Sequence, residues 1–329
     1  MLYVTTRNHN NIHTVRHPLT KDRGPDGGLY IPFRNPDFPE DLMYGLKDKS
    51  FGQCIADILN LYFGTKLSGW DVDFAVGRHP FRLVPMSHKI LIAELWNNPG
   101  GDFFWLTHKL RNLVMPEADP NSAVSEWVSL VIRMAVIFGI YSELESLELA
   151  GRNKTMDISV CSGDFSAPMA LYHARQIGLP VGRIVFGCNE NSGAWDLIHH
   201  GELHTGASVV TTDTPYCDHS VPPGLERLIY DCFGLQEAVR FGQAVKKGLL
   251  YTVTEEMRQC LSDGLFGAVI SKRRTDSVIR NIFRTNSYQL SGYTALAYGA
   301  LQDYRSTNNE AGPALILAEN GPAVNQTAR

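Results

Sequence analysis

The sequence lacks the features that mark nucleic-acid-binding, exported or membrane-spanning proteins. Its formal net charge of −4 leaves no basic surplus for a polyanion. Its longest apolar stretch, 127–141, is interrupted by Arg133 and is shorter than the roughly 20 apolar residues that cross a bilayer, so we expect a buried helix there. Residues 1–10 carry polar side chains where a signal peptide needs an apolar core. We therefore expect a cytoplasmic protein that binds neither nucleic acid nor membrane.

The cysteines form no recognisable disulfide or zinc pattern. None of them belongs to a CxxC pair, and a chain of 329 residues can bury enough apolar surface to fold without cross-links. We expect no metal site, and we expect reduced core thiols at Cys54, Cys161, Cys188, Cys217, Cys232 and Cys260.

The first part of the chain combines turn signals with amphipathic helices. Residues 50–63 carry apolar side chains at steps of three and four, which predicts a helix. A second helix is predicted over 103–115, where Asp102 can cap the first turn. Residues 116–125 are polar and predict a linker, after which 127–149 resumes helical periodicity up to Gly151.

From residue 157 onward the pattern changes to strand, turn and helix. Short apolar runs at 157–161 and 183–186 flank a predicted helix over 167–177, which indicates a parallel sheet covered by helices. A helix over 293–304 and a strand over 314–318 repeat the theme. Ligands on such sheets bind at the carboxyl ends of strands, where the turn at 162–166 lies.

Two motifs in this framework resemble threonine synthases closely. Thr6-Arg7, followed by residues 24–32 (GPDGGLYIP), is similar to the STRG and APDGGLYVP signatures near the N-terminus of that family. Residues 161–166 (CSGDFS), followed by 177–180 (IGLP), resemble the family's SGNFGN loop and the MGLP that closes the next helix.

Further matches follow in the same order along the chain, although the last two are degraded. Asn189-Glu190-Asn191, with Gly201 downstream, is similar to the family's NEN and TG elements. Residues 288–295 (YQLSGYTA) and 317–323 (LAENGPA) stand where the family has YLLDPHTA and ATAHPAKF. The resemblance therefore covers most of the chain.

The resemblance implies a pyridoxal-phosphate (PLP) enzyme, whose lysine holds the cofactor as an imine and moves protons. The family's ELFHGPTLAFKD stretch aligns without gaps to residues 94–105, and its lysine position is Phe104. Phenylalanine can neither form an imine nor carry a proton. Lys109 could replace the lysine only with a five-residue insertion, and the ungapped alignment keeps Phe103, Leu106 and Leu110 on one helical face. We therefore expect Lys109 to be a solvated helix lysine.

The loop that would bind the cofactor phosphate is also altered. It comprises Ser162, Gly163, Asp164, Phe165 and Ser166, and Asp164 and Ser166 replace the Asn and second Gly of the family. A carboxylate repels phosphate, and loss of a glycine limits close backbone approach. The N–H groups of Ser162 and Gly163 could still bind a smaller anion at the start of the next helix, or the segment could be a simple turn capped by Asp164.

The domain organisation departs from the family between residues 115 and 127. The family carries there a small domain of about a hundred residues, a normal size for a separable unit. We expect an α/β fold with a parallel sheet flanked by helices and without this small domain: an N-terminal domain over 1–115, a linker over 116–126 and a large α/β domain over 127–329.

Three other polar clusters have simpler interpretations than a functional site. His199, His200, Glu202 and His204 are interrupted by Gly201, which favours surface histidines at a helix end over a metal site. The basic run 272–274, with Arg280 and Arg284 beyond it, is typical of a solvated helix face, although it could receive an anion. Asp213, Asp218 and His219 lie in one loop without a visible catalytic partner.

Two functions therefore remain open. The first is a threonine synthase-like protein that has lost PLP-dependent catalysis and needs no cofactor, acting as a binding or regulatory pseudoenzyme or with replaced chemistry in the same cleft. The second is an active PLP-dependent lyase that uses Lys109 on O-phosphohomoserine or a related amino acid. In either case a small anionic or amino-acid ligand and a homodimer are possible.

Overall fold

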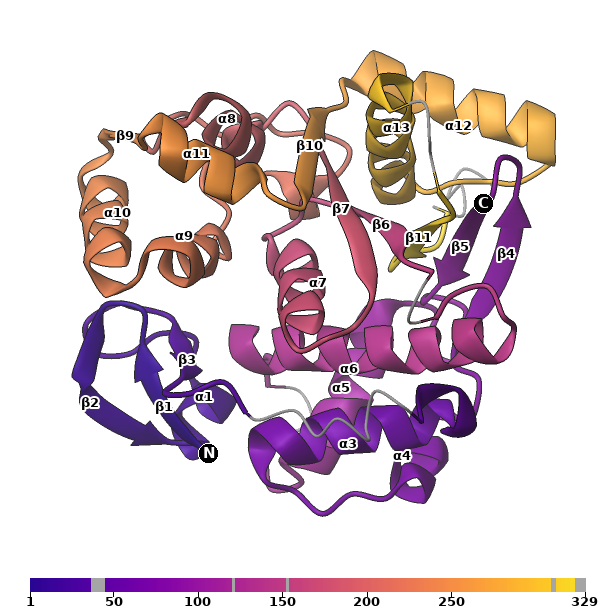
Figure 1. The fold of residues 1–329 in the computed structure, drawn as a ribbon, viewed down its shortest axis with the longest axis horizontal. Coiled ribbons are helices and arrows are strands. Elements are labelled where there is room, and N and C mark those ends of the chain that lie inside the picture. The colour runs from indigo at the N-terminus through magenta and orange to yellow at the C-terminus, as the bar shows by residue number, and fades with distance from the viewer. Residues whose placement is uncertain (37–44, 120–121, 152–153, 309–311, 323–329) are drawn as a thin grey trace, which may run out of the picture.

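A six-stranded sheet forms the centre of the computed structural model, which describes residues 1–36, 45–119, 122–151, 154–308 and 312–322 (Figure 1). In spatial order its strands are β10 (Leu265–Val269), β7 (Val181–Cys188), β6 (Met156–Cys161), β11 (Ala314–Ala318), β5 (Ile90–Glu94) and β4 (Arg82–Met86). All neighbours are parallel except β4, which runs antiparallel to β5 at the edge. The predicted α/β class with a parallel sheet is confirmed, with one antiparallel edge strand added.

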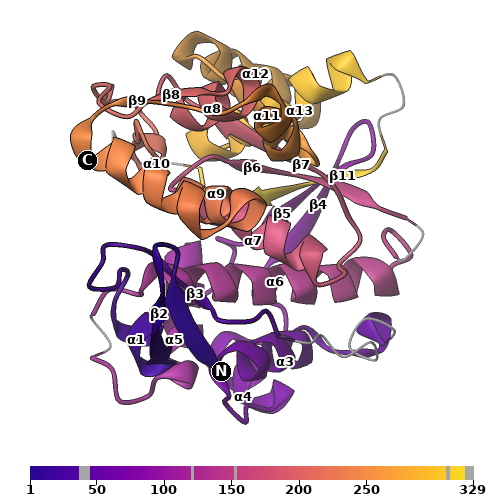
Figure 2. The ribbon, with the colours of Figure 1, turned by 60° about the vertical axis from the view of Figure 1, so that its left-hand side comes forward.

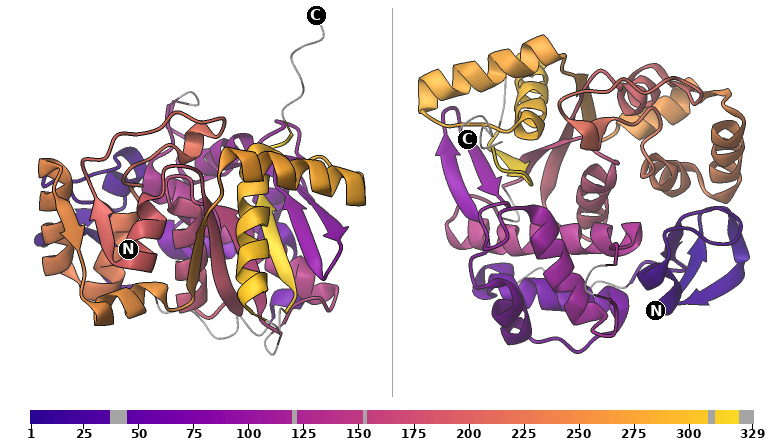
Figure 3. Two further views of the ribbon diagram at one scale, coloured as in Figure 1. Left: turned by 90° about the horizontal axis from the view of Figure 1, so that it is seen from above. Right: turned by 180° about the vertical axis from the view of Figure 1, so that it is seen from behind.

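Helices cover both faces of this sheet (Figure 3). On one side lie α6 (Glu126–Ser146) and α7 (Ser166–Gln176), and on the other lie α12 (Lys272–Asn286) and α13 (Gly292–Thr307). Along β11, Leu315 and Leu317 belong to the core with α6 and α7, whereas Ile316 belongs to the core with α13. Successive side chains of a strand point to opposite faces, so both faces of β11 must be apolar.

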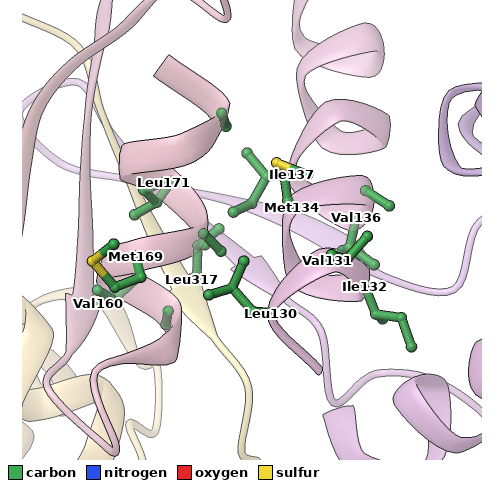
Figure 4. Close-up of a cluster of buried hydrophobic side chains, with 14 of the residues drawn as sticks. Leu130, Val131, Ile132, Met134, Val136, Ile137, Val160, Met169, Leu171 and Leu317 are labelled. Carbon is green, nitrogen blue, oxygen red and sulfur yellow. The ribbon is translucent and has the colours of Figure 1, made fainter. Parts of the chain in front are cut away.

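The long helix α6 is apolar on all sides because it is packed on all sides. α3 (Phe51–Phe63) packs against one side of α6, and α7 packs against the side that faces the sheet. Figure 4 shows Leu130, Met134 and Ile137 directed toward Met169 and Leu171 of α7. Among the described residues it is the one helix long and apolar enough to cross a membrane, but 89% of that apolar window is buried within the protein. The predicted buried helix is confirmed.

The N-terminal part of the chain lies beside and below this layer (Figure 2). It contains a small sheet, β2-β1-β3, and helices that pack near α6. Its elements are β1 (Leu2–Thr5), β2 (Asn8–Thr14), α1 (Arg16–Thr20), β3 (Tyr30–Pro32), η1 (Leu46–Asp48), α3, α4 (Gly69–Val76) and α5 (Phe103–Val114).

Two of these helices begin where their capping residues predict. Ser50 accepts a hydrogen bond from the Gln53 N–H at the start of α3, and Asp102 accepts one from the Trp105 N–H at the start of α5. The predicted helices over 50–63 and 103–115 are therefore confirmed within one residue at each end.

A peripheral layer of helices follows β7 along the chain. Its elements are α8 (Gly193–His200), β8 (Glu202–His204), η2 (Pro215–Cys217), α9 (Leu225–Phe233), α10 (Leu235–Lys247), β9 (Leu250–Thr252) and α11 (Glu255–Ser262). β8 and β9 pair antiparallel apart from the main sheet.

The linker between α5 and α6 contains no helix or strand in its described residues, 116–119 and 122–125. The six-stranded sheet takes β4 and β5 from before this linker and the other four strands from after it. The proposed division into 1–115 and 127–329 stays a prediction, and so does the absence of the family's small domain.

One expectation about the cysteines is wrong. Cys54, Cys188 and Cys217 are buried, but Cys161 and Cys232 are half-buried and Cys260 is exposed. Cys260 lies near the end of the short, largely exposed helix α11, which has one buried face. Such helices place even apolar side chains in solvent when they fall on the outer face.

A buried carboxylate fastens the N-terminal sheet to the peripheral helices. Glu226 of α9, with 2% of its side chain exposed, accepts hydrogen bonds from Arg7 Nε and Nη2, both at 2.8 Å. The Thr6 hydroxyl and Arg23 Nη1 donate to the same carboxylate. The Thr6-Arg7 signature is thus a structural clamp in this protein, because a buried carboxylate is stable only when its oxygens are paired.

This clamp can be tested by removing its charge. Glu226→Gln leaves the Arg7 guanidinium without its partner, and we expect the free energy of unfolding in urea to fall by about 3 kcal/mol. Glu255→Gln, which breaks the solvent-exposed pair with Arg258, is the control and should change nothing measurable. Equal effects of the two variants would contradict the clamp.

Candidate functional site

A cavity of about 530 Å³ opens at the N-terminus of α5, on the side of α6. α5 begins there because the Phe103 N–H donates to the Glu319 carbonyl at 3.1 Å, which ties the helix to the residue after β11. The cavity therefore lies at the carboxyl end of a central strand, where α/β sheets bind ligands. Its lining residues are Phe103, Phe104, Thr107, His108, Ser122, Ala123, Val124, Ser129, Arg133, Tyr216, Glu319 and Asn320.

An ion pair crosses the polar wall of this cavity. Arg133 of α6 donates from Nε to Glu319 Oε1 at 2.8 Å and from Nη2 to Glu319 Oε2 at 3.0 Å. Its guanidinium carbon lies 5.1 Å from the centre of the Phe103 ring. Bidentate pairing of this kind holds both side chains in fixed positions. Burial alone would lower the pKa of Arg133, but Glu319, Tyr216 and Asp164 more than offset it, so the guanidinium stays charged.

Tyr216 connects this ion pair to the loop after β6. Its hydroxyl accepts from Arg133 Nη2 at 3.3 Å and donates to Asp164 Oδ1 at 2.8 Å. Ser166 donates to the same carboxylate from its N–H, at 2.9 Å, and from its hydroxyl. Burial raises the pKa of Asp164, but Arg133 and the bonds from Ser166 and Tyr216 outweigh it, and the pKa lies below its usual value. Asp164 is therefore ionised at neutral pH.

Four N–H groups of the loop, those of Ser162, Gly163, Phe165 and Ser166, already have partners within the protein. The Ser162 N–H donates to the Gly187 carbonyl and the Phe165 N–H to the Ser162 carbonyl, both at 2.8 Å, while the Gly163 N–H hydrogen-bonds to the Cys217 thiol. A Cβ atom at Gly163 would lie 2.4 Å from the Tyr216 ring, so the ring covers this residue closely. Phe165, at φ +70°, is fully buried and packs edge to face on Phe186. The loop is thus occupied by its own side chains, and anion binding by residues 162–166 stays a prediction with little support from this geometry.

The two candidate positions for the catalytic lysine lie in different surroundings. Phe104 lines the cavity with 66% of its surface exposed, and its ring is 4.1 Å from that of His108. Lys109 is exposed on α5, with its ammonium 5.6 Å from the centre of the Trp105 ring, and it does not line the cavity. A primary amine at position 104, and not at 109, would therefore reach the cavity.

Sequence reasoning missed the residues that form the polar wall. Arg133 could have been found, because a single arginine inside an otherwise apolar helix must be paired when it is buried. Glu319 could also have been found, because it directly follows the predicted strand 314–318 and ligands bind at the carboxyl ends of such strands. No sequence pattern points to Tyr216, since it lies in an irregular loop far from its partners in sequence.

The other predicted clusters have structural roles. α8 ends at His200 and Gly201 takes a left-handed conformation, so His200 and His204 share no helical face, and His199 and His200 are exposed as expected at a helix end. Lys272 pairs with Asp213, and Arg274 pairs with Asp303.

Asp218 organises the loop that follows the asparagine motif. Its carboxylate accepts from the side chains of Asn189 and Thr212, both at 2.7 Å, and from Asn191 at 3.2 Å. The motif 189–191 thus fixes the loop that carries Tyr216 beside the cavity. His219 has no place in the cavity lining.

Comparison with known proteins agrees with this architecture. Residues 2–76 match the family model described as the threonine synthase N terminus. A threonine synthase of Pseudomonas aeruginosa is 26% identical over 176 residues, which are 50% of this chain and 36% of that protein. The matched sequence therefore spans about a third of this relative's length.

Solved threonine synthases share the fold over nearly the whole chain. The PLP-bound threonine synthase of Brucella melitensis superposes with a TM-score of 0.83 at 17% identity, covering 98% of this chain and 89% of that one. The yeast enzyme gives a TM-score of 0.80 at 14% identity, covering 98% and 87%. The protein is thus an α/β protein with the threonine synthase fold. The match of residues 2–76 to the threonine synthase N terminus adds a sequence likeness to this likeness of fold.

The Asp164 network predicts how stability depends on pH. Because the pKa of Asp164 is lower in the folded protein than its ordinary value of 3.8, its contribution is complete above that value and is lost as the pH falls through the folded pKa. The difference in free energy of unfolding between wild type and Asp164→Asn should be constant above about pH 5 and should shrink below about pH 4. Urea titrations from pH 3 to 7 measure it, and a difference that grows on acidification would contradict the ionised carboxylate.

Proposed function

We propose that this threonine synthase-like protein has lost PLP-dependent catalysis and binds a small molecule in the Phe104 cavity. The observation that carries the proposal is the side chain at position 104, a phenylalanine in the cavity wall where the family alignment expects the lysine. No lysine belongs to the described lining of the cavity. Imine formation needs a primary amine within bonding distance of the cofactor, and none is available there.

The residues of the described cavity do not fit PLP in other respects either. A cofactor phosphate needs free N–H donors and a positive local field. The N–H groups of Ser162, Phe165 and Ser166 are used within the protein, and Asp164 adds a negative charge. The one arginine in the lining is shared between Glu319 and Tyr216. We therefore derive no catalytic step through this cofactor.

The rival function is an active PLP-dependent lyase that uses Lys109. Its support is the fold likeness to a PLP-bound threonine synthase. The position of Lys109 does not support this rival function, because the Lys109 side chain is exposed and lies over the Trp105 ring.

The visible spectrum with added PLP distinguishes the two functions. We expect no imine band in the wild type and no change on borohydride reduction. A specific imine band that disappears on reduction and is absent in Lys109→Ala would establish the rival.

A gain-of-function variant tests whether position 104 is the lost lysine. Phe104→Lys combined with Asp164→Asn places an amine in the cavity and removes the opposing charge, so it should form a reducible imine band with PLP. Phe283→Lys, at another largely exposed phenylalanine, is the matched control and should not. Equal bands in the two variants would mean that position 104 has no special relation to the cofactor site.

A further inference from the structure

The hydrogen-bond capacity of the polar wall is unequal. Arg133 has five N–H donors, and its hydrogen bonds to Glu319, Ser129 and Tyr216 use four of them. An anion entering the cavity would therefore find a single free guanidinium hydrogen. The Glu319 carboxylate, by contrast, has about four acceptor sites and uses two of them on Arg133. The wall thus offers more acceptors than donors.

The charges of the same cluster are also unequal. Arg133 is the one cation, while Glu319 pairs with it directly and the ionised Asp164 reaches it through Tyr216. The neighbouring guanidinium of Arg111 donates to the Asp119 carbonyl and to Ser122. Arg111 is not among the lining residues, so within this cluster two carboxylates face one guanidinium. This ratio disfavours an anionic ligand, because like charges are costly where water is excluded.

The cavity lining also has an apolar part. It consists of Phe103, Phe104, Ala123 and Val124, and the exposed ring of Phe104 presents an aromatic surface. Aromatic rings attract cations as well as apolar groups. A volume of about 530 Å³ lies within the range of pockets that hold small organic ligands.

We infer that this cavity binds a small organic cation, a primary amine on an apolar or aromatic body, whose ammonium group donates to Glu319 and whose body lies against Phe104. The inference rests on the proposed function and gives it a ligand class. The cavity would thus prefer a cation where a phosphate-binding site prefers an anion. The reason is that the unused hydrogen-bonding groups of the polar wall are mainly carboxylate oxygens that accept, rather than N–H groups that donate.

Isothermal titration with three probes of one shape tests the charge preference. The probes are 2-phenylethylamine, 3-phenylpropionate and the neutral 2-phenylethanol. We expect the amine to bind at least tenfold more tightly than the carboxylate, with the alcohol between them. The inference is overturned if the carboxylate binds as tightly as the amine, or if the amine does not bind at millimolar concentration.

Two variants assign the binding to this cavity. Glu319→Gln should weaken the amine about tenfold or more and strengthen the carboxylate, because Arg133 loses a competing partner. Since Glu319→Gln also breaks a buried ion pair, Phe104→Ala provides a variant at an exposed side chain, and it should weaken the amine about three- to tenfold. Phe283→Ala is its matched control. Amine affinity unchanged in both Glu319→Gln and Phe104→Ala would place the binding elsewhere and overturn the inference.

Failure of this inference and failure of the proposed function give different results. A reducible PLP imine in the wild type defeats the proposed loss of catalysis whatever the amine does. Absence of the imine together with preference for 3-phenylpropionate defeats only the assignment of ligand charge.

Discussion

The ion pair between Arg133 and Glu319 is the interaction on which the cavity depends. It joins the most buried helix, α6, to the residue after the central strand β11, and the carbonyl of Glu319 also receives the first N–H of α5. Tyr216 carries the same network to Asp164 and the loop after β6. The Arg133 guanidinium thus connects α6, the end of β11, the loop that carries Tyr216 and the loop after β6. A buried arginine requires such partners, because it would otherwise remain an uncompensated charge.

The same ion pair also sets the polarity of the cavity within a fold shared with threonine synthases. The scaffold superposes on threonine synthases over 98% of the chain, and the wall of the cavity presents Phe104, a carboxylate and a guanidinium with four of its five N–H donors in use. Function resides in the site rather than in the fold. The sheet, the helix starts and the Thr6-Arg7 clamp are structural features whose stability does not depend on the chemistry of the cavity. The polar groups of the cavity satisfy one another, which stabilises the fold and leaves less capacity for an anionic cofactor.

Periodicity predicted the parts of the fold that local physics determines. The helices at 50–63 and 103–115 follow from apolar spacing and from the caps Ser50 and Asp102. The strand at 314–318 was predicted at its observed bounds because five apolar residues lie between polar segments. β4 was not predicted because Pro85 interrupts it, and Pro is tolerated there because β4 lies at the edge of the sheet. β5 was not predicted either, although its apolar run resembles that of β11.

Only part of the candidate site could be predicted, because long-range contacts, like sheet positions, are not encoded in a local segment. Phe104 and the loop 162–166 came from motif positions, whereas the partners of Arg133 come from sequence separations of 83 and 186 residues. No local pattern encodes which carboxylate a buried arginine will meet.

The central claim is that no lysine of this chain serves as a cofactor lysine. Peptide mass spectrometry after incubation with stoichiometric PLP and borohydride reduction tests it most directly. We expect only scattered, substoichiometric pyridoxyl labelling of surface lysines. Stoichiometric labelling of a single lysine, Lys109 above all, would contradict it.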